Sequence, residues 1–170
     1  MEIKDFDKEI ASGNLKNIYF LYGDEQFLIE TKVKSIKKKL VDSSFEDFNF
    51  ALYNGKDNAV EDIIESSVSY PVMADRKLVI LKNTGFLSNP KSREFKAVSE
   101  LCSNIPEYLC LLIIESGFDK KKENSIRFIE KNGGIVRFDY MPQAQLERWL
   151  EKRFVKHEKI IYPKELAEIV

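Results

Sequence analysis

The sequence has little of what several classes of protein depend on. Among its 170 residues there are only two cysteines and one histidine. Two cysteines, Cys102 and Cys110, are too few for a disulfide scaffold, and both lie in or beside apolar runs, so we expect buried thiols in a reducing compartment. With His157 as the only histidine, this stretch of chain cannot assemble a histidine-based zinc site or a serine–histidine triad.

An excess of one charge and a long apolar run are also missing. Lysine and arginine number 27 against 28 acidic residues, so no net charge draws the whole chain onto nucleic acid or an anionic membrane. The longest apolar run, 109–114, is far too short to span a bilayer. The first ten residues, MEIKDFDKEI, carry too many charges for a signal peptide. We therefore expect a cytoplasmic protein without a membrane partner.

The hydrophobic content, 44%, is that of a packed globule, and its pattern predicts the fold class. Solid apolar runs of strand length alternate with amphipathic helical segments, which favours an α/β domain with a five-stranded, mainly parallel sheet flanked by helices. The expected strands are 18–22, 48–53, 77–81, 109–114 and 135–138. Asp24 is expected to cap the second helix, Asp57 or Asn58 the third, and Gly133-Gly134 to end a helix over 124–131.

A boundary is expected at Pro142. Beyond it, Leu146, Trp149, Leu150 and Phe154 recur at helical spacing with no strand behind them, so residues from about 141 onward are expected to begin a separate, all-helical unit. Tyr162-Pro163 is typical of the opening of another helix. The chain ends at Val170 before any C-cap signal, and we interpret it as a piece of a longer protein.

The expected sheet lacks the residues of a catalytic centre. A parallel sheet binds ligands at the carboxyl ends of its strands, but the first strand is followed by Gly23-Asp24-Glu25, and no GK[ST] phosphate loop occurs. Asp24, Glu25, Glu115 and Asp139 fall near strand ends, where carboxylates serve more often as caps than as metal ligands. We therefore predict no catalytic residue, cofactor or metal. The alternative is a divergent nucleotide-binding hydrolase that uses Glu115 with Mg²⁺.

Two further features allow two interpretations each. The lysines between 32 and 39 are expected to form a solvated helix face, with a weak contact to nucleic-acid phosphate as the alternative. Between a helix and the third strand stands SYPVMADR (69–76), where a short polar loop is usual. Val72 and Met73 either return to the core or form an exposed apolar tip that docks into a partner's pocket. Each such side chain contributes about 1.5–3 kcal/mol when fully buried.

The order and spacing of five stretches resemble the delta subunit family of the bacterial DNA polymerase III clamp loader. The stretches are IYFLYGDEQFLIE (18–30), DFNFALYNG (47–55), SYPVMADRKLVILKN (69–83), YLCLLIIES (108–116) and YMPQAQLERWLEKRF (140–154). The resemblance implies an AAA+-type domain over 1–140 that binds no ATP. It also implies that residues 141–170 are the beginning of a helical lid domain, which is truncated here. A C-terminal collar domain would lie outside this stretch of chain.

The same resemblance implies a function in DNA replication. Val72 and Met73, with Tyr70 and Pro71 beside them, would bind the beta sliding clamp and open its ring; the family more usually has a leucine and a large aromatic residue there. The other loader subunits, gamma/tau and delta prime, would join the full-length protein, and DNA would be contacted only in the assembled loader. The fragment itself would be monomeric. The alternatives are another inactive clamp-loader subunit and an unrelated α/β interaction module.

Overall fold

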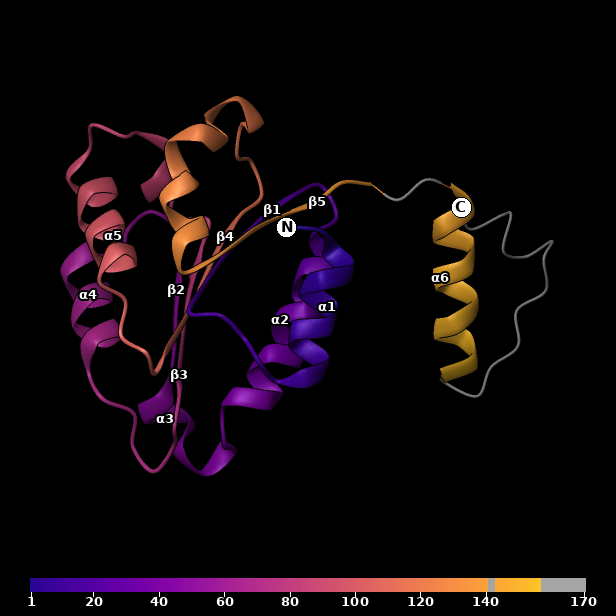
Figure 1. Ribbon diagram of the computed structural model, residues 1–170, viewed down its shortest axis with the longest axis horizontal. Coiled ribbons are helices and arrows are strands. Elements are labelled where there is room, and N and C mark those ends of the chain that lie inside the picture. The colour runs from indigo at the N-terminus through magenta and orange to yellow at the C-terminus, as the bar shows by residue number, and fades with distance from the viewer. Residues whose placement is uncertain (141–142, 157–170) are drawn as a thin grey trace. The chain divides into compact units, whose positions relative to one another are not determined.

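The computed structural model describes residues 1–140 and 143–156. The chain divides into two compact units, Met1–Phe138 and Asp139–Val170 (Figure 1). In the first unit the elements are α1 (Ile3–Ser12), β1 (Ile18–Gly23), α2 (Gln26–Leu40), the 3₁₀ helix η1 (Ser43–Phe45), α3 (Glu46–Asn49), β2 (Phe50–Asn54), α4 (Val60–Val68), β3 (Lys77–Lys82), η2 (Phe86–Ser88), α5 (Arg93–Ser103), β4 (Leu109–Glu115), η3 (Lys120–Lys131) and β5 (Gly133–Phe138). The second unit contributes α6 (Gln143–Lys156).

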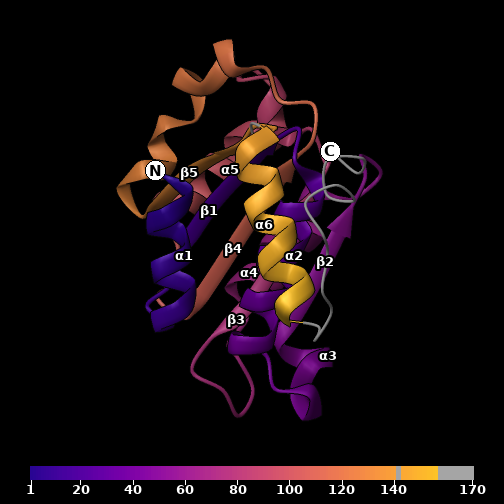
Figure 2. The ribbon, with the colours of Figure 1, turned by 90° about the vertical axis from the view of Figure 1, so that its right-hand side faces the viewer.

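The five strands form one sheet in the order β2-β3-β4-β1-β5, and every pair of neighbours is parallel. Helices α1 and α2 cover one face, and α4, α5 and η3 cover the other (Figure 1). Figure 2 shows α1 and α2 from their own side of the sheet. The expected α/β class with a parallel sheet between helices is confirmed.

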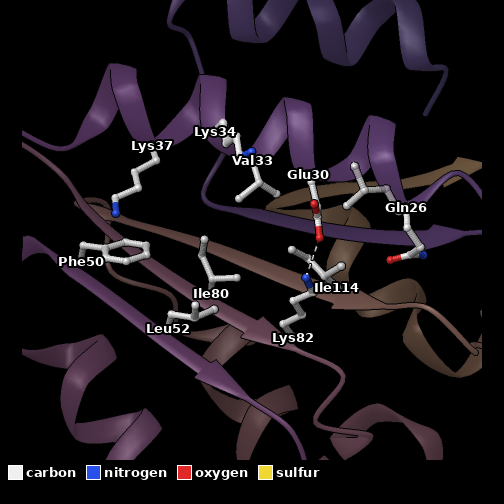
Figure 3. Close-up of a pocket in the computed structure, with 11 residues that line it drawn as sticks. Gln26, Glu30, Val33, Lys34, Lys37, Phe50, Leu52, Ile80, Lys82 and Ile114 are labelled. Atoms are coloured by element: carbon white, nitrogen blue, oxygen red, sulfur yellow. Dashed lines mark hydrogen bonds and ion pairs between the residues drawn. The ribbon is translucent and has the colours of Figure 1, made fainter.

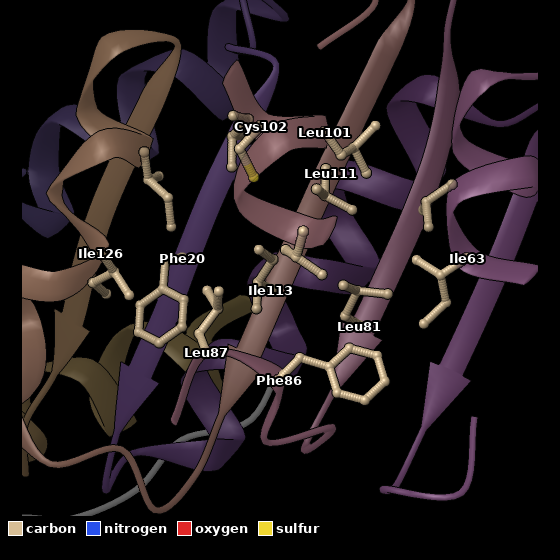
Figure 4. Packing of buried hydrophobic residues seen from close by; sticks show 14 of the residues in the cluster. Phe20, Ile63, Leu81, Phe86, Leu87, Leu101, Cys102, Leu111, Ile113 and Ile126 are labelled. Atoms are coloured by element: carbon tan, nitrogen blue, oxygen red, sulfur yellow. The ribbon is translucent and has the colours of Figure 1, made fainter. Parts of the chain in front are cut away.

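The core explains why the strands are solid apolar runs. Strands β1, β3 and β4 are buried on both faces, so each of their positions packs against a helix layer or a neighbouring strand. Alternate residues such as Phe20, Leu81 and Ile113 meet the side chains of α5 and η2 on one face (Figure 4). Burial raises the pKa of both thiols, Cys102 and Cys110, to about 12, and both cysteines are free.

Three local expectations at helix and strand starts were wrong. The strand expected over 48–53 begins only at Phe50, because residues 48 and 49 complete α3. Helix α2 begins after Glu25, so Asp24 is not its N-cap. The N-cap position of α4 is Ala59, because the amide of Asn58 donates instead to the carbonyl oxygens of Asn54 and Gly55 and closes the turn after β2.

Gly133-Gly134 does not end a helix but opens β5, a fourth correction to the expected pattern. A Cβ on Gly133 would lie 2.1 Å from the Ile18 carbonyl oxygen, so the close approach of β5 to β1 requires glycine there. The preceding helical segment is a long 3₁₀ helix, Lys120–Lys131, instead of an α-helix over 124–131.

In the second unit, α6 carries the expected apolar positions, and Leu146, Trp149, Leu150 and Phe154 are half-buried. The expected boundary residue Pro142, the single histidine and the Tyr162-Pro163 pair lie outside the described residues. No helix in residues 1–140 and 143–156 is long and apolar enough to cross a membrane.

Candidate protein-docking loop

The segment 69–76, here named the docking loop, connects α4 to the amino end of β3, at the lower end of the sheet in Figure 1. Its apolar side chains do not return to the core: Tyr70 is 80% exposed, Met73 is 81% exposed and Val72 is 39% exposed. Pro71 between them is half-buried. Of the two interpretations of this segment, the structure therefore bears out the exposed apolar tip.

A buried asparagine fixes the centre of the loop. The Asn49 side-chain amide donates to the Val72 carbonyl oxygen at 2.7 Å, and the Val72 backbone N–H donates back to Asn49 Oδ1 at 2.8 Å. Asn49 itself is fully buried and is the last residue of α3, directly before β2. The amide therefore holds the backbone of Val72 as a neighbouring strand would, while the Val72 side chain remains partly exposed.

Both flanks of the loop are also tied to the domain. On one flank the Lys77 ammonium, buried at the start of β3, donates to Ser69 Oγ at 2.6 Å, and burial lowers its pKa. On the other flank the Arg76 guanidinium donates to three backbone carbonyls that belong to the segment before β1 and to the start of β4. These are Leu15 at 2.6 Å, Lys16 at 3.1 Å and Leu109 at 3.2 Å. A charged donor shared among three acceptors gives the loop a rigid base.

Ring stacking and backbone geometry complete the loop. Tyr70 packs on Tyr108 with ring centroids 4.9 Å apart, and the Tyr108 hydroxyl donates to the Val68 carbonyl oxygen at 2.5 Å. Burial, with Tyr70 as a second cause, raises the pKa of Tyr108. Met73 has a φ of 52°, a left-handed conformation that costs a non-glycine residue about 1–2 kcal/mol. The surrounding contacts must therefore hold the loop in this shape against that cost.

Two more exposed apolar side chains border the loop. Phe48, in the helix turn directly before Asn49, is exposed, and so is Val68 at the end of α4. With Tyr70, Val72 and Met73, five large apolar side chains on or next to the loop are therefore exposed, and exposed apolar area of this kind marks protein-interaction sites when it is continuous. The sequence pattern did not single out Phe48, because it lies in an apolar run that was assigned to a strand.

At the opposite, carboxyl end of the sheet, the residues that follow β1 make contacts within the domain. A Cβ on Gly23 would lie 2.2 Å from the Phe138 carbonyl oxygen, and the Glu25 backbone N–H donates to that same oxygen at 3.1 Å. The glycine and the amide that would face a phosphate in a nucleotide site therefore serve the contact with β5.

Glu115, the candidate Mg²⁺ ligand, is likewise engaged. Its Oε1 accepts the Gly85 backbone N–H at 2.8 Å and the Thr84 hydroxyl at 3.3 Å, and burial raises its pKa. The carboxylate thus closes the turn after β3. Within the part of the chain that the structure describes, no group of three or more histidine, cysteine or acidic side chains is placed to hold a metal ion.

The lysine-rich helix α2 is partly used by the fold as well. Lys37 forms an ion pair with Glu46 at 2.5 Å, and the Lys39 ammonium donates to the Ala11 carbonyl oxygen at 3.0 Å. These two lysines attach α2 to its neighbours, whereas Lys34 and Lys38 are exposed, and a contact with nucleic-acid phosphate stays a prediction.

The chain thus contains an α/β domain with a parallel sheet between helices and an exposed apolar loop at the amino end of that sheet. The profile of the family described as DNA polymerase III, delta subunit, matches residues 19–139. The chain therefore belongs to the DNA polymerase III delta subunit family, as the resemblance predicts.

Relatives and solved structures agree with this assignment. A DNA polymerase III subunit delta of Bacillus subtilis is 32% identical over 90 residues, which are 53% of this chain and 26% of that protein. The solved Bacillus subtilis DNA clamp loader delta protein matches with a TM-score of 0.77 at 21% identity, over 99% of this chain and 51% of that one. A DNA polymerase III gamma subunit-related protein from Thermotoga maritima matches with a TM-score of 0.54 at 14% identity, over 92% and 53%. The fold is thus AAA+-like, and this chain spans about half the length of these solved relatives.

Proposed function

We propose that this chain binds the beta sliding clamp through the docking loop and, within a clamp loader, holds one interface of the ring open during DNA replication. The observation that carries the proposal is an exposed apolar loop tip, Tyr70 to Met73, fixed in the middle and on both flanks. Family membership supports the choice of the clamp as the partner. The proposed domains are a clamp-binding domain over 1–140 and the start of a helical lid over 141–170.

The rigid base of the loop supports binding in a specific way. A loop that is ordered before binding loses little conformational entropy when it docks, so more of its contact energy becomes affinity. Val72 and Met73 each contribute about 1.5–3 kcal/mol if the partner buries them fully. The flexible thioether of Met73 suits a pocket shaped for another large side chain.

The proposed mechanism depends on differential binding. A closed ring and an open ring are in equilibrium, and a subunit that binds the open form more tightly shifts the equilibrium by the ratio of the two affinities. No catalytic residue of this chain takes part. The gamma/tau subunits would supply ATP hydrolysis and, with delta prime, complete the loader. We place this activity in the cytoplasm.

The test is calorimetric titration of the chain with its cognate clamp. We expect Val72→Ala combined with Met73→Ala to weaken binding about 100-fold or more while the thermal unfolding temperature is kept, because both side chains are exposed. Val155→Ala, an exposed apolar residue in α6, is the matched control and should bind like the wild type. A double variant that binds normally would move the site elsewhere, and a folded wild type that does not bind would remove the clamp as partner.

A thermal-shift assay with Mg²⁺ and ATP tests the competing hydrolase. A ligand present at 100 times its dissociation constant stabilises a protein by about 2.7 kcal/mol, a readily measured shift. We expect no shift, because the Glu25 N–H and the Glu115 carboxylate are already bonded within the fold. Stabilisation by ATP that Glu115→Gln abolishes would favour the hydrolase instead.

A further inference from the structure

A second exposed apolar feature lies away from the tip of the docking loop, along α2. A groove of about 300 Å³ runs between this helix and the sheet (Figure 3). The sheet side of the groove is formed by Phe50 and Leu52 of β2, Ile80 of β3 and Ile114 of β4, and Val33 faces it from the helix. The groove therefore has apolar walls on both sides.

Within the first unit, Met1–Phe138, no helix lies over this part of the sheet. Between α2 and β2 the backbone forms only the three-residue η1 and the four-residue α3, neither long enough to cover β2. On the opposite face, Ala51 and Tyr53 of the same strand pack against the main core. β2 is an edge strand, and only one of its faces is covered. On the other face, which forms the groove, the side chain of Leu52 is 52% exposed. The uncovered face adjoins α2 at the place where a further helix of this layer would lie.

The rim of the groove is cationic. Lys34, Lys37 and Lys82 line it, and Lys38 lines the adjoining hollow with Lys34 and Lys37. Two acidic groups face these four lysines: Glu30 pairs with Lys82 at 2.9 Å, and Glu46 pairs with Lys37 at 2.5 Å. The Lys37 ammonium also stands 3.8 Å from the centre of the Phe50 ring. Four lysines against two carboxylates leave the rim with an excess of positive charge beside apolar walls.

We propose that the groove binds an amphipathic helix of a partner protein, with the partner's apolar stripe against Phe50, Leu52 and Ile80 and acidic side chains against the lysine rim. The cationic rim favours a partner segment with acidic side chains. We infer that this segment is a helix, because a helix would complete the layer that α1 and α2 form on this face of the sheet. The proposal does not depend on clamp binding by the docking loop.

The probe is a fluorescent synthetic peptide of about 16 residues, with leucines at i, i+3, i+4 and i+7 and glutamates beside them. A peptide with lysine in place of every glutamate controls for charge, and one with serine in place of every leucine controls for the apolar stripe. Binding to the 170-residue chain is measured by fluorescence anisotropy at two salt concentrations. We expect the glutamate peptide to bind about tenfold more tightly than either control and to weaken as salt rises.

Variants locate the binding site. Leu52→Asp should weaken the glutamate peptide about tenfold or more, and Lys34→Glu several-fold, with a matching gain for the lysine peptide. The controls are Val68→Asp, a side chain of nearly equal exposure (48%) outside the groove, and Lys91→Glu, an exposed lysine outside it. Circular dichroism melts confirm that each variant is folded.

Three outcomes would overturn the proposal: equal binding of the glutamate and lysine peptides, no binding of the glutamate peptide, or equal losses in Leu52→Asp and Val68→Asp. Self-association of the wild type that Leu52→Asp abolishes would assign the groove to a second copy and also overturn it. Val72→Ala with Met73→Ala should leave peptide binding unchanged. Failure of this proposal and failure of the proposed clamp site are therefore distinguishable.

Discussion

Asn49 should control the order of the docking loop. Its amide makes two hydrogen bonds, of 2.7 and 2.8 Å, with the backbone of Val72, and it is fully buried. Each bond contributes about 1 kcal/mol net, and a backbone group left without its partner costs about 1–3 kcal/mol when it is dry. Because Val72 is 39% exposed, water can reach part of its backbone, so the lower values apply. Asn49→Ala is therefore expected to raise the free energy of the ordered loop by about 1–2 kcal/mol.

Hydrogen exchange followed by NMR measures this change at one atom. An increase of 1–2 kcal/mol corresponds to about 5- to 30-fold faster exchange of the Val72 amide in Asn49→Ala. If the loop must be ordered to dock, the affinity for the clamp falls in proportion to the fraction of molecules whose loop remains ordered. Asn49→Asp keeps the acceptor for the Val72 N–H but turns a carboxylate oxygen toward the Val72 carbonyl, so it should not restore the wild-type affinity.

Asn58→Ala is the matched control for this prediction. The Asn58 amide also makes two hydrogen bonds to backbone, at 3.0 and 2.8 Å, but to the turn that follows β2. Its removal should lower the thermal stability while leaving Val72 exchange and clamp affinity unchanged. Unchanged Val72 exchange in Asn49→Ala, or equally fast exchange in Asn58→Ala, would refute the argument that Asn49 orders the loop.

Three other sites give sharp expectations. Gly133→Ala forces the 2.1 Å contact with backbone described above, so urea unfolding should show a loss of about 3 kcal/mol, against less than about 0.5 kcal/mol for Gly117→Ala, which has open space around it. Met73→Gly accepts the φ of 52° without strain, so the unfolding free energy should stay within about 1 kcal/mol of wild type while clamp affinity falls; a parallel loss of both would contradict this. Burial raises the pKa of Glu115 above its ordinary 4.5, so the folded state holds that proton more tightly, and the stability it contributes is present at low pH and lost as pH rises above about 4.5. Glu115→Gln should flatten this region of the curve of stability against pH, and curves that remain parallel would show that Glu115 is not its source.

The sequence was most informative where burial was complete. Strands β1, β3 and β4 have helices or strands on every side, so their apolar runs are continuous and marked the parallel sheet directly. The edge strand β2 is only partly buried, and its apolar run continues backward into α3. An apolar run without alternation could not show where that helix ended and the strand began.

The docking loop could be predicted as a candidate site from the sequence, but the residues that hold it in place could not. The apolar content of 69–76 was visible as an exception to the usual polar loop. Asn49, however, precedes Val72 by 23 residues, and Arg76 contacts the Leu15 carbonyl 61 residues away. These partners meet only because β2 lies beside β3 and the segment before β1 lies near the start of β4. Local periodicity contains no information on such contacts, so the anchored geometry required the tertiary structure.

The two ends of the sheet use their polar groups differently. At the carboxyl end, Gly23, the Glu25 N–H and the Glu115 carboxylate are all engaged in contacts within the domain. Freeing them for a phosphate would break contacts that hold β5 and the turn after β3. At the amino end, hydrogen bonds from Asn49 and Arg76 instead hold the backbone of the docking loop in a shape that leaves its apolar side chains exposed. The proposed capture of a protein surface is therefore supported by an ordered, exposed apolar loop at the amino end, while the polar groups named at the carboxyl end are satisfied within the domain.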